Sequence, residues 1–185
     1  TNLIWYLFKV IKNNLRKIFL SILIIITIFL LDQHTKNFFN SKLQFQVPTE
    51  VYSNFDLYLT YNFGVAFSFL SDNENWQKTL LLLLIPALIL FLCLYLMANI
   101  DSYKNSIALS FILGGAIGNY FDRITHGYVI DFISLHAFNF YWPTFNVADS
   151  FITIGAVIFL LNNLKKKENY KTLKKSKEFF KKIKK

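Results

Sequence analysis

The sequence has little of several residues that soluble and secreted domains use. Of its 185 residues one is cysteine, three are proline and six are glycine, and charged residues make up 17%. The single cysteine, Cys93, excludes an intrachain disulfide and a metal site built from several thiolates. Hydrophobic residues make up 54% of the chain, with a mean hydropathy of +0.37, whereas a soluble domain is roughly 45–50% apolar. This composition indicates a protein of the lipid bilayer.

Four apolar runs are long enough to be considered as membrane-spanning helices, which need about 20 mostly apolar residues. We expect an all-α polytopic membrane protein with one domain over residues 1–164 and a lysine-rich cytoplasmic tail over residues 165–185. No small-residue cleavage site follows the first run, so we interpret it as a retained span rather than a signal peptide. The sequence opens at Thr1 rather than Met, and a few native residues are expected to be missing or replaced there. The approximate spans are 15–38, 77–98, 105–123 and 144–164, and the outer loops are 39–76 and 124–143.

Basic residues are distributed unevenly about these spans, and positive charge in short loops stays on the cytoplasmic side. Lys9, Lys12, Arg16 and Lys17 precede the first apolar run, which starts at Ile18, and 11 lysines follow Leu164. We therefore expect both termini in the cytoplasm and both loops on the outer face of the membrane. The net charge of +9 comes mostly from the tail, which favours contact with anionic lipid headgroups, or plain solvation, over binding to nucleic acid.

The outer loops carry strand patterns. The segment "FDLYLTY" (55–61) alternates apolar and polar residues at the period of a half-buried strand, and "YVIDFI" (128–133) is a second candidate. These segments predict a small extracytoplasmic sheet, and "VAFSFL" (65–70) an interfacial element. The aromatic residues of the second loop are expected to anchor it at the membrane surface. They are Phe138, Phe140, Tyr141 and Trp142.

Several polar residues stand where hydrocarbon makes them costly. Asp32 and Lys36 are four residues apart, which places them on one helix face as an ion pair. A stripe of small residues at four-residue spacing in the third span predicts close approach of another helix. Arg123, at the outer end of that span, could pair with Asp122, reach toward the interface, or hold a substrate carbonyl with its fork of donors. The stripe comprises Ser106, Ser110, Gly114, Gly118 and Asp122.

Asp131 lies in the second outer loop and Asp149 near the start of the fourth span. The intervening 17 residues start and end at the same membrane face, so the two acids are able to meet there. Two adjacent carboxyl groups share one proton and can act as general base and general acid, as in aspartic proteases. Spacing alone leaves open a cation site, a proton relay or two unrelated helix caps. His126 and His136 flank Asp131 without the tight spacing of a zinc site.

Five sequence blocks together resemble the lipoprotein signal peptidase (signal peptidase II) family in order, spacing and membrane placement. The ordered set covers about two thirds of the chain and is far more specific than any one block. The resemblance extends to four spans, a small outer sheet and an interfacial element. The third position after Asn62 is Val65 where many relatives have alanine, and the lysine tail is not part of the family pattern. The blocks are "DQHTK" (32–36), "NFGVAF" (62–67), "GGAIGNYFDR" (114–123), "VIDFI" (129–133) and "FNVADS" (145–150).

The resemblance implies that Asp131 and Asp149 are the catalytic dyad of a membrane aspartic endopeptidase. It implies a diacylglyceryl-modified prolipoprotein as substrate, cut before its lipid-bearing cysteine. We expect that the reaction needs no metal or cofactor and that the enzyme is a monomer. Matching positions assign substrate-binding roles to Asn62, Asn119, Arg123 and Asn146, and supporting roles to Asp32, Lys36, Gly64 and Asp122.

Three other classes remain as alternatives on the residues themselves. They are a small transporter or proton channel, a scaffold that binds signal helices without cutting them, and an intramembrane protease whose two acids lie inside facing helices. The last is disfavoured because Asp131 lies in a loop segment. We also expect the signal helix of a substrate to dock beside the small-residue face of the third span.

Overall fold

The computed structural model describes residues 2–64, 75–98, 100, 102–138 and 140–183. Two strands lie between α1 and α2, two more lie between α3 and α4, and all four form one sheet. The helices are α1 (Asn2–Lys42), α2 (Asn75–Ala98), α3 (Tyr103–His126) and α4 (Val147–Ile183), and the strands are β1 (Thr49–Tyr52), β2 (Phe55–Asn62), β3 (Val129–Ala137) and β4 (Phe140–Tyr141).

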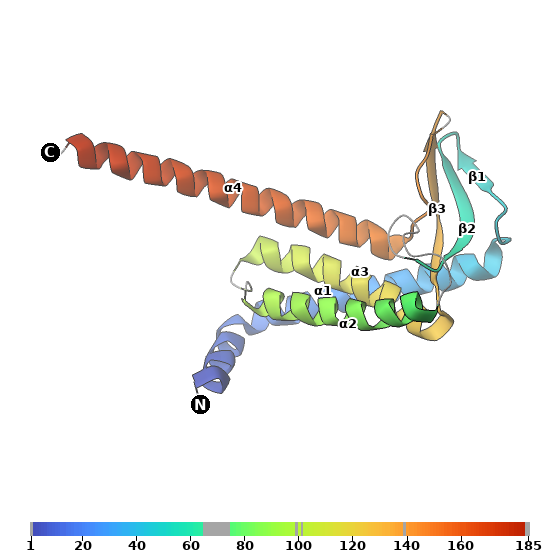
Figure 1. Ribbon diagram of the computed structural model, residues 1–185, viewed down its shortest axis with the longest axis horizontal. Coiled ribbons are helices and arrows are strands. Elements are labelled where there is room, and N and C mark those ends of the chain that lie inside the picture. The colour runs from blue at the N-terminus through green and yellow to red at the C-terminus, as the bar shows by residue number, and fades with distance from the viewer. Residues whose placement is uncertain (1, 65–74, 99, 101, 139, 184–185) are drawn as a thin grey trace.

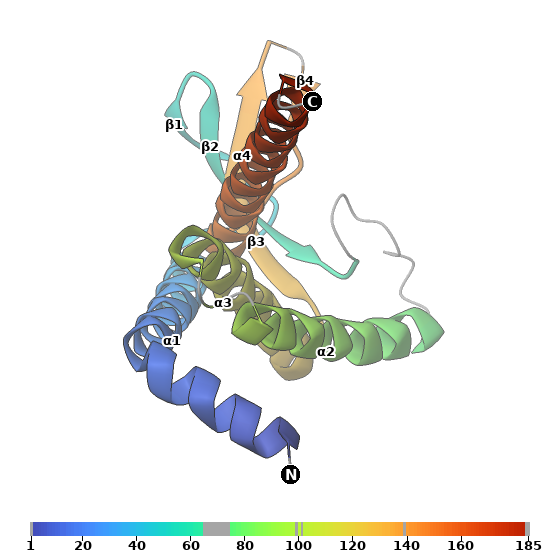
Figure 2. The same ribbon diagram turned by 90° about the vertical axis from the view of Figure 1, so that its left-hand side faces the viewer.

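Helix α3 is the centre of the bundle and contacts α1, α2 and α4 (Figures 1 and 2). Its small residues make the close approach possible: a Cβ atom on Gly114 would lie 2.9 Å from the Cβ of Ile28 in α1. On the neighbouring face, a Cβ on Gly115 would meet the carbonyl oxygen of Ala148 in α4. The predicted packing role of the stripe is confirmed. Helix α1 contacts this face at Gly114, and the expectation that a substrate helix docks beside the face stays a prediction.

An apolar core lies between α2 and α3, toward the connection that joins these two helices. Leu96, Ile100, Leu109 and Leu113 are buried together, and side chains of α1 and α4 pack around them. Apolar burial of this kind is what a helix face rich in leucine and isoleucine predicts. The polar residues of α3 instead gather toward its two ends.

Helices α1 and α4 extend beyond their predicted spans. In α1 the backbone leaves helical geometry at Asn14, with φ −121° and ψ 17°, and the segment before it turns away from the bundle (Figure 1). Helix α4 begins at Val147 rather than near residue 144, because Asn146 caps it: its Oδ1 accepts the N–H of Asp149 at 2.9 Å. The helix then continues without a break through the lysine-rich segment to Ile183.

The sheet lies across the end of the bundle opposite the two chain termini (Figure 1). Its order is β1-β2-β3-β4, and every pair of neighbouring strands is antiparallel. Both predicted strands are confirmed, and their register pairs Asn62 with Val129 and Thr60 with Asp131. The expected interfacial element at residues 65–70 lies outside the described residues.

Two helical segments of the described chain are long and apolar enough to cross a membrane. They are Asn14–Lys42, with a hydropathy of 2.1, and Val147–Lys165, with 1.7, and a shorter apolar helix covers Leu83–Leu96. Helix α3 does not meet this criterion, since buried asparagine, serine and aspartate residues on its inward faces dilute its hydropathy. The architecture is thus helical with a small antiparallel sheet, and the crossing of all four helices stays a prediction.

Candidate active site

The polar residues singled out in the sequence converge where the sheet meets the outer ends of α1, α3 and α4. Asp131 lies on β3 and Asp149 in the first turn of α4. Asn119 and Arg123 come from the last turns of α3, and Asn62 from the end of β2. Four separate elements, β2, β3, α3 and α4, therefore supply side chains to one place.

Asp131 is almost completely buried, with 1% of its surface exposed. Both of its oxygens accept hydrogen bonds from amides, Oδ1 from Asn146 Nδ2 at 2.7 Å and Oδ2 from Asn62 Nδ2 at 3.1 Å. Burial raises the pKa of the Asp131 carboxyl to about 7, and the nearby charge of Asp149 acts in the same direction. The two amides and the more distant charge of Lys36 oppose this shift. Near neutral pH this carboxyl can therefore hold or release a proton.

Asp149 is held by the start of α4 and by α3. Its Oδ2 accepts the backbone N–H of Asn146 at 3.2 Å, while its own N–H donates to the Asn146 side chain, a reciprocal cap of the helix. Its Oδ1 accepts the Asn119 amide at 2.8 Å. In contrast to Asp131, Asp149 keeps part of its surface exposed. A rigid helix end thus presents one carboxylate beside a buried one.

Asn146 connects the two acids. Its side-chain amide donates to Asp131 and its backbone N–H donates to Asp149. The same amide nitrogen lies 3.1 Å from Asn119 Oδ1 and 3.3 Å from the Ile130 carbonyl, so its two protons are shared among three acceptors. The side chain is fully buried, which leaves it no alternative partner in water. One residue therefore fixes the position of one carboxyl relative to the other.

Arg123 and Gly64 join the loop after β2 to α3. The Arg123 guanidinium donates to the Gly64 carbonyl at 2.7 Å and to the Asn119 carbonyl at 3.2 Å, and the Gly64 N–H donates to Asn62 Oδ1 at 3.0 Å. The buried Nε of Arg123 has no hydrogen-bond partner among the described residues. In this structure Arg123 holds a backbone carbonyl of its own chain at the edge of the site.

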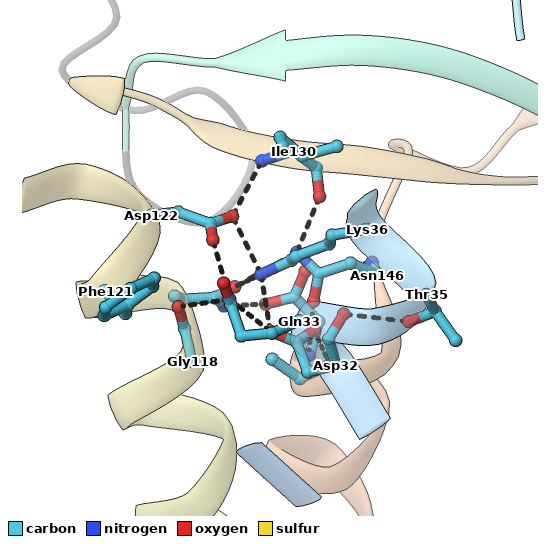
Figure 3. Close-up of polar contacts among 12 residues, drawn as sticks. Asp32, Gln33, Thr35, Lys36, Gly118, Phe121, Asp122, Ile130 and Asn146 are labelled. Atoms are coloured by element: carbon cyan, nitrogen blue, oxygen red, sulfur yellow. Dashed lines mark hydrogen bonds and ion pairs between the residues drawn. The ribbon is translucent and has the colours of Figure 1, made fainter. Parts of the chain in front are cut away.

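A buried charge cluster joins α1 and α3 next to Asn119 and Ile130 (Figure 3). Lys36 Nζ contacts Asp32 Oδ2 at 2.8 Å, Asp122 Oδ2 at 3.0 Å and Asn119 Oδ1 at 2.8 Å. The predicted pairing of Asp32 with Lys36 is confirmed. The suggested pairing of Asp122 with Arg123 is wrong, because the Asp122 carboxylate points across to α1, where Lys36 and Gln33 bind it.

Gln33 is the polar member of this cluster that sequence reasoning missed. Its Nε2 donates to Asp122 Oδ1 at 2.8 Å and lies 3.3 Å from both Asp32 Oδ2 and the Gly118 carbonyl (Figure 3). The available signal was its position within "DQHTK", directly beside Asp32. A glutamine next to an acid in a membrane helix needs acceptors from a neighbouring helix, and α3 supplies them.

The two histidines that flank Asp131 in the sequence are used elsewhere. His136 lies 3.2 Å from Asp56 and stacks on Tyr141, and His126 stacks on Tyr128. Within the residues that the structure describes, no group of three or more His, Cys, Asp or Glu side chains is arranged to hold a metal ion. The zinc alternative therefore has no arrangement of ligands to support it.

Comparison with protein families matches residues 24–165 to the family described as signal peptidase (SPase) II. The lipoprotein signal peptidase of Chromobacterium violaceum is 42% identical over 141 residues, which cover 75% of this chain and 87% of the relative. The lipoprotein signal peptidase of Francisella tularensis subsp. novicida is 40% identical over 159 residues, 84% of this chain and 96% of the relative.

Two solved structures, both described as bacterial membrane enzymes obtained by the in meso method, share the fold. The first, at 2.3 Å resolution, has a TM-score of 0.72 and 30% identity and covers 80% of this chain and 90% of its own. The second, at 1.9 Å resolution, has a TM-score of 0.68 and 28% identity, with 78% and 92% covered.

Proposed function

This chain belongs to the signal peptidase II family, and from that membership we propose that Asp131 and Asp149 are its catalytic pair. The chain is a membrane peptidase that removes signal peptides from prolipoproteins during lipoprotein maturation. The observation that carries the residue assignment is the link through Asn146, which donates to Asp131 from its side chain and to Asp149 from its backbone. Two carboxyls held in this way are suited to share a proton.

In the proposed mechanism the pair divides the work of an aspartic endopeptidase. The deprotonated acid takes a proton from a water molecule, which attacks the carbonyl carbon of the peptide bond to be cut. The protonated acid donates a hydrogen bond to that carbonyl and then gives its proton to the leaving amine. A pKa near 7 for Asp131 supports this, since neither protonation state is costly at neutral pH. The step requires no metal or cofactor.

The other residues receive roles from the contacts that they make. Asn62, Asn119 and Asn146 orient the acids through their amides, and we assign them and Arg123 to substrate binding at the same edge. Asp32, Lys36, Gly64 and Asp122 support these residues. We also propose that the enzyme is a monomer.

Replacing each acid by asparagine tests the pair. We expect Asp131→Asn and Asp149→Asn, purified in detergent, to cleave a lipidated precursor roughly 100- to 10,000-fold more slowly, the range for loss of general acid–base catalysis. Asp56→Asn is the matched control, because Asp56 is an acid of the same sheet that faces His136 instead. Normal cleavage by both site variants would show that Asp131 and Asp149 are not the catalytic pair. Binding without turnover by the unaltered protein would favour a scaffold.

We further propose that the substrate is the diacylglyceryl-modified precursor, cut before the lipidated cysteine. A lipid chain that stays in the bilayer would place that cysteine at the membrane surface, at the level of the site. Precursors with and without the diacylglyceryl group, compared at equal concentration, test this. Equal rates would contradict it.

The proposed topology has four spans at about 15–38, 77–98, 105–123 and 144–164, with both termini cytoplasmic and the site toward the extracytoplasmic face of the bacterial inner membrane. The lysine-rich segment and the N-terminus lie at the end of the bundle away from the sheet (Figure 1), and the tail is placed to contact anionic lipids. The exposed aromatic residues Phe138, Phe140, Tyr141 and Trp142 support contact of the sheet with the membrane surface.

Labelling of single cysteines in intact cells tests this orientation. In a background with Cys93→Ala, a membrane-impermeant thiol reagent should label Tyr52→Cys, on exposed β1, and leave Lys174→Cys unlabelled. Labelling of the tail position with intact cells would reverse the proposed topology.

A further inference from the structure

The buried charge cluster contacts both acids indirectly, through the residues that precede them. Asp122 Oδ2 accepts the backbone N–H of Ile130 at 3.1 Å, and Ile130 directly precedes Asp131. Asp32 Oδ1 accepts the backbone N–H of Ala148 at 2.9 Å, and Ala148 directly precedes Asp149. Each carboxylate of the cluster therefore holds the chain one residue before one acid.

Lys36 joins the two carboxylates. Its ammonium has three N–H donors, and three acceptors surround it: Asp32, Asp122 and the side-chain oxygen of Asn119. With 1% of its surface exposed, it has no room for water to replace a lost partner (Figure 3). The Asn119 oxygen is thereby turned toward Lys36, which directs the amide nitrogen of the same side chain to Asp149.

We propose that Asp32, Lys36 and Asp122 form a frame that sets the distance between the two acids: Lys36 binds two carboxylates, and each carboxylate holds the backbone directly before one acid. The three are positioning residues and do not touch the substrate. The proposal rests on the assignment of Asp131 and Asp149 as the catalytic pair. It explains how β3, which carries Asp131, and the start of α4, which carries Asp149, are held at a fixed distance from each other.

The frame is a costly way to hold helices together if stability were its only effect. Removing charges from water costs several kcal/mol per ion, and a buried ion pair is often no more stable than an apolar replacement. All three side chains are nonetheless at most 1% exposed. A charged cluster does, however, enforce one geometry, because each hydrogen bond has a fixed direction. A misplacement of about 1 Å in an active site can reduce the rate roughly 100-fold.

The test uses the double variant Lys36→Met/Asp122→Asn, which removes the bridge and leaves the net charge of the cluster unchanged. We expect kcat for a lipidated precursor to fall roughly 10- to 100-fold, with KM within about threefold of the unaltered enzyme, measured well below the unfolding temperature. Asn105→Ala, at the other end of α3, is the control for lost stability. It should leave kcat unchanged.

Hydrogen exchange supplies a readout that does not depend on activity. In the folded double variant the amides of Ile130 and Ala148 should exchange at least tenfold faster, with α2 unchanged. If the double variant does not fold, Asp32→Asn keeps the shape of the side chain and should lower kcat by roughly three- to tenfold. A folded variant with normal kcat, or with unchanged exchange at both amides, overturns the frame. Failure of the dyad assignment would appear separately, as normal cleavage by the Asp131→Asn and Asp149→Asn proteins.

Discussion

The two ends of the α3–α4 interface both contain buried asparagines, and they use them differently. At the inner end, which is the end away from the sheet, the Asn105 side-chain oxygen accepts a hydrogen bond from Asn162. The Asn105 amide nitrogen lies 3.5 Å from Asn163 Oδ1, and the Asn163 amide donates to the Phe159 carbonyl. At the outer end, next to the sheet, the Asn119 side-chain oxygen accepts hydrogen bonds from Lys36 and Asn146, and the Asn119 amide donates to Asp149. The inner amides bind one another and the helix backbone. The outer amides instead bind charged groups: Asn119 binds Lys36 and Asp149, and Asn146 binds Asp131.

The difference shows that a buried polar residue in a helix bundle is not by itself a sign of function. Neutral amides that satisfy one another need nothing further and act as links between helices. A site becomes apparent where the polar groups are charged and where their hydrogen bonds leave the helices for a strand and a helix end. Changes at the outer end should therefore affect the rate, and matched changes at the inner end should affect stability alone.

The largest effect among these changes is expected at Asn146. Asn146→Ser keeps a side chain that can cap α4 but removes the amide that donates to Asp131. We expect a rate roughly 100-fold lower, the scale for loss of one fixed donor in an active site. Some stability is also lost, because Asp131 Oδ1 loses a donor that water cannot replace. Asn146→Ala should lose the rate to the same extent and in addition about 1 kcal/mol of stability from the missing cap.

Cleavage assays and thermal melts of both Asn146 variants check this separation of rate from stability. A serine variant with normal activity would mean that the amide contact to Asp131 has no part in catalysis.

A matched pair of glycines tests the same separation by packing. A Cβ on Gly115 would meet the Ala148 carbonyl at the outer end, and a Cβ on Gly155 would lie 2.6 Å from the Ala108 carbonyl at the inner end. Both alanine variants overpack the α3–α4 contact and should lose about 1–3 kcal/mol of stability. Only Gly115→Ala displaces the residue before Asp149, so it alone should reduce kcat, by roughly tenfold.

The activity of the two glycine variants should be compared at a temperature where both remain folded. Equal loss of kcat in both would mean that the site responds to general loosening of the interface.

Local spacing predicted the parts of this site that depend on neighbouring residues in the chain. The i,i+4 spacing of Asp32 and Lys36 predicted their pairing, and alternation predicted β2. The return of the chain to one membrane face predicted that Asp131 and Asp149 approach each other. The first two features follow from helical and strand periodicity and the third from the order of the apolar runs, all of which a single sequence displays.

Other parts of the site depend on contacts between segments that are distant in the sequence. Asp122 pairs with Lys36 and accepts the N–H of Ile130, while Asp32 accepts the N–H of Ala148. These contacts depend on how α1 is rotated against α3. Spacing gives the face of a helix but not the depth or rotation at which it meets its partner. The start of α4 at Val147 likewise depends on the reciprocal cap between Asn146 and Asp149.

The pH dependence of stability provides a further contrast between the two ends. Because burial raises the pKa of Asp131 from 3.8 to about 7, the folded protein keeps a proton that the unfolded chain releases in this window. Stability from this residue is therefore lost as the pH rises from about 4 to about 7. Asp131→Asn should consequently melt at a higher temperature than the unaltered protein at pH 8, and the difference should shrink at pH 5.

The matching inner-end variant for this measurement is Asn105→Ala, which alters no charge. Its difference in melting temperature from the unaltered protein should be the same at both pH values. A pH-independent difference for Asp131→Asn would mean that the Asp131 carboxyl is already ionised well below neutral pH.

The smallest effect is expected at the inner end itself. Asn105 is 1% exposed and binds α4 through Asn162, so Asn105→Ala and Asn162→Ala should each lower stability, with a coupling energy of about 0.6 kcal/mol in a double-mutant cycle. The value is small because the unfolded chain in a membrane also finds polar partners. Cleavage of the lipidated precursor should stay normal in all three variants. A drop in kcat without a matching loss of stability would show that the inner amides also reach the site, which would end the distinction between the two ends.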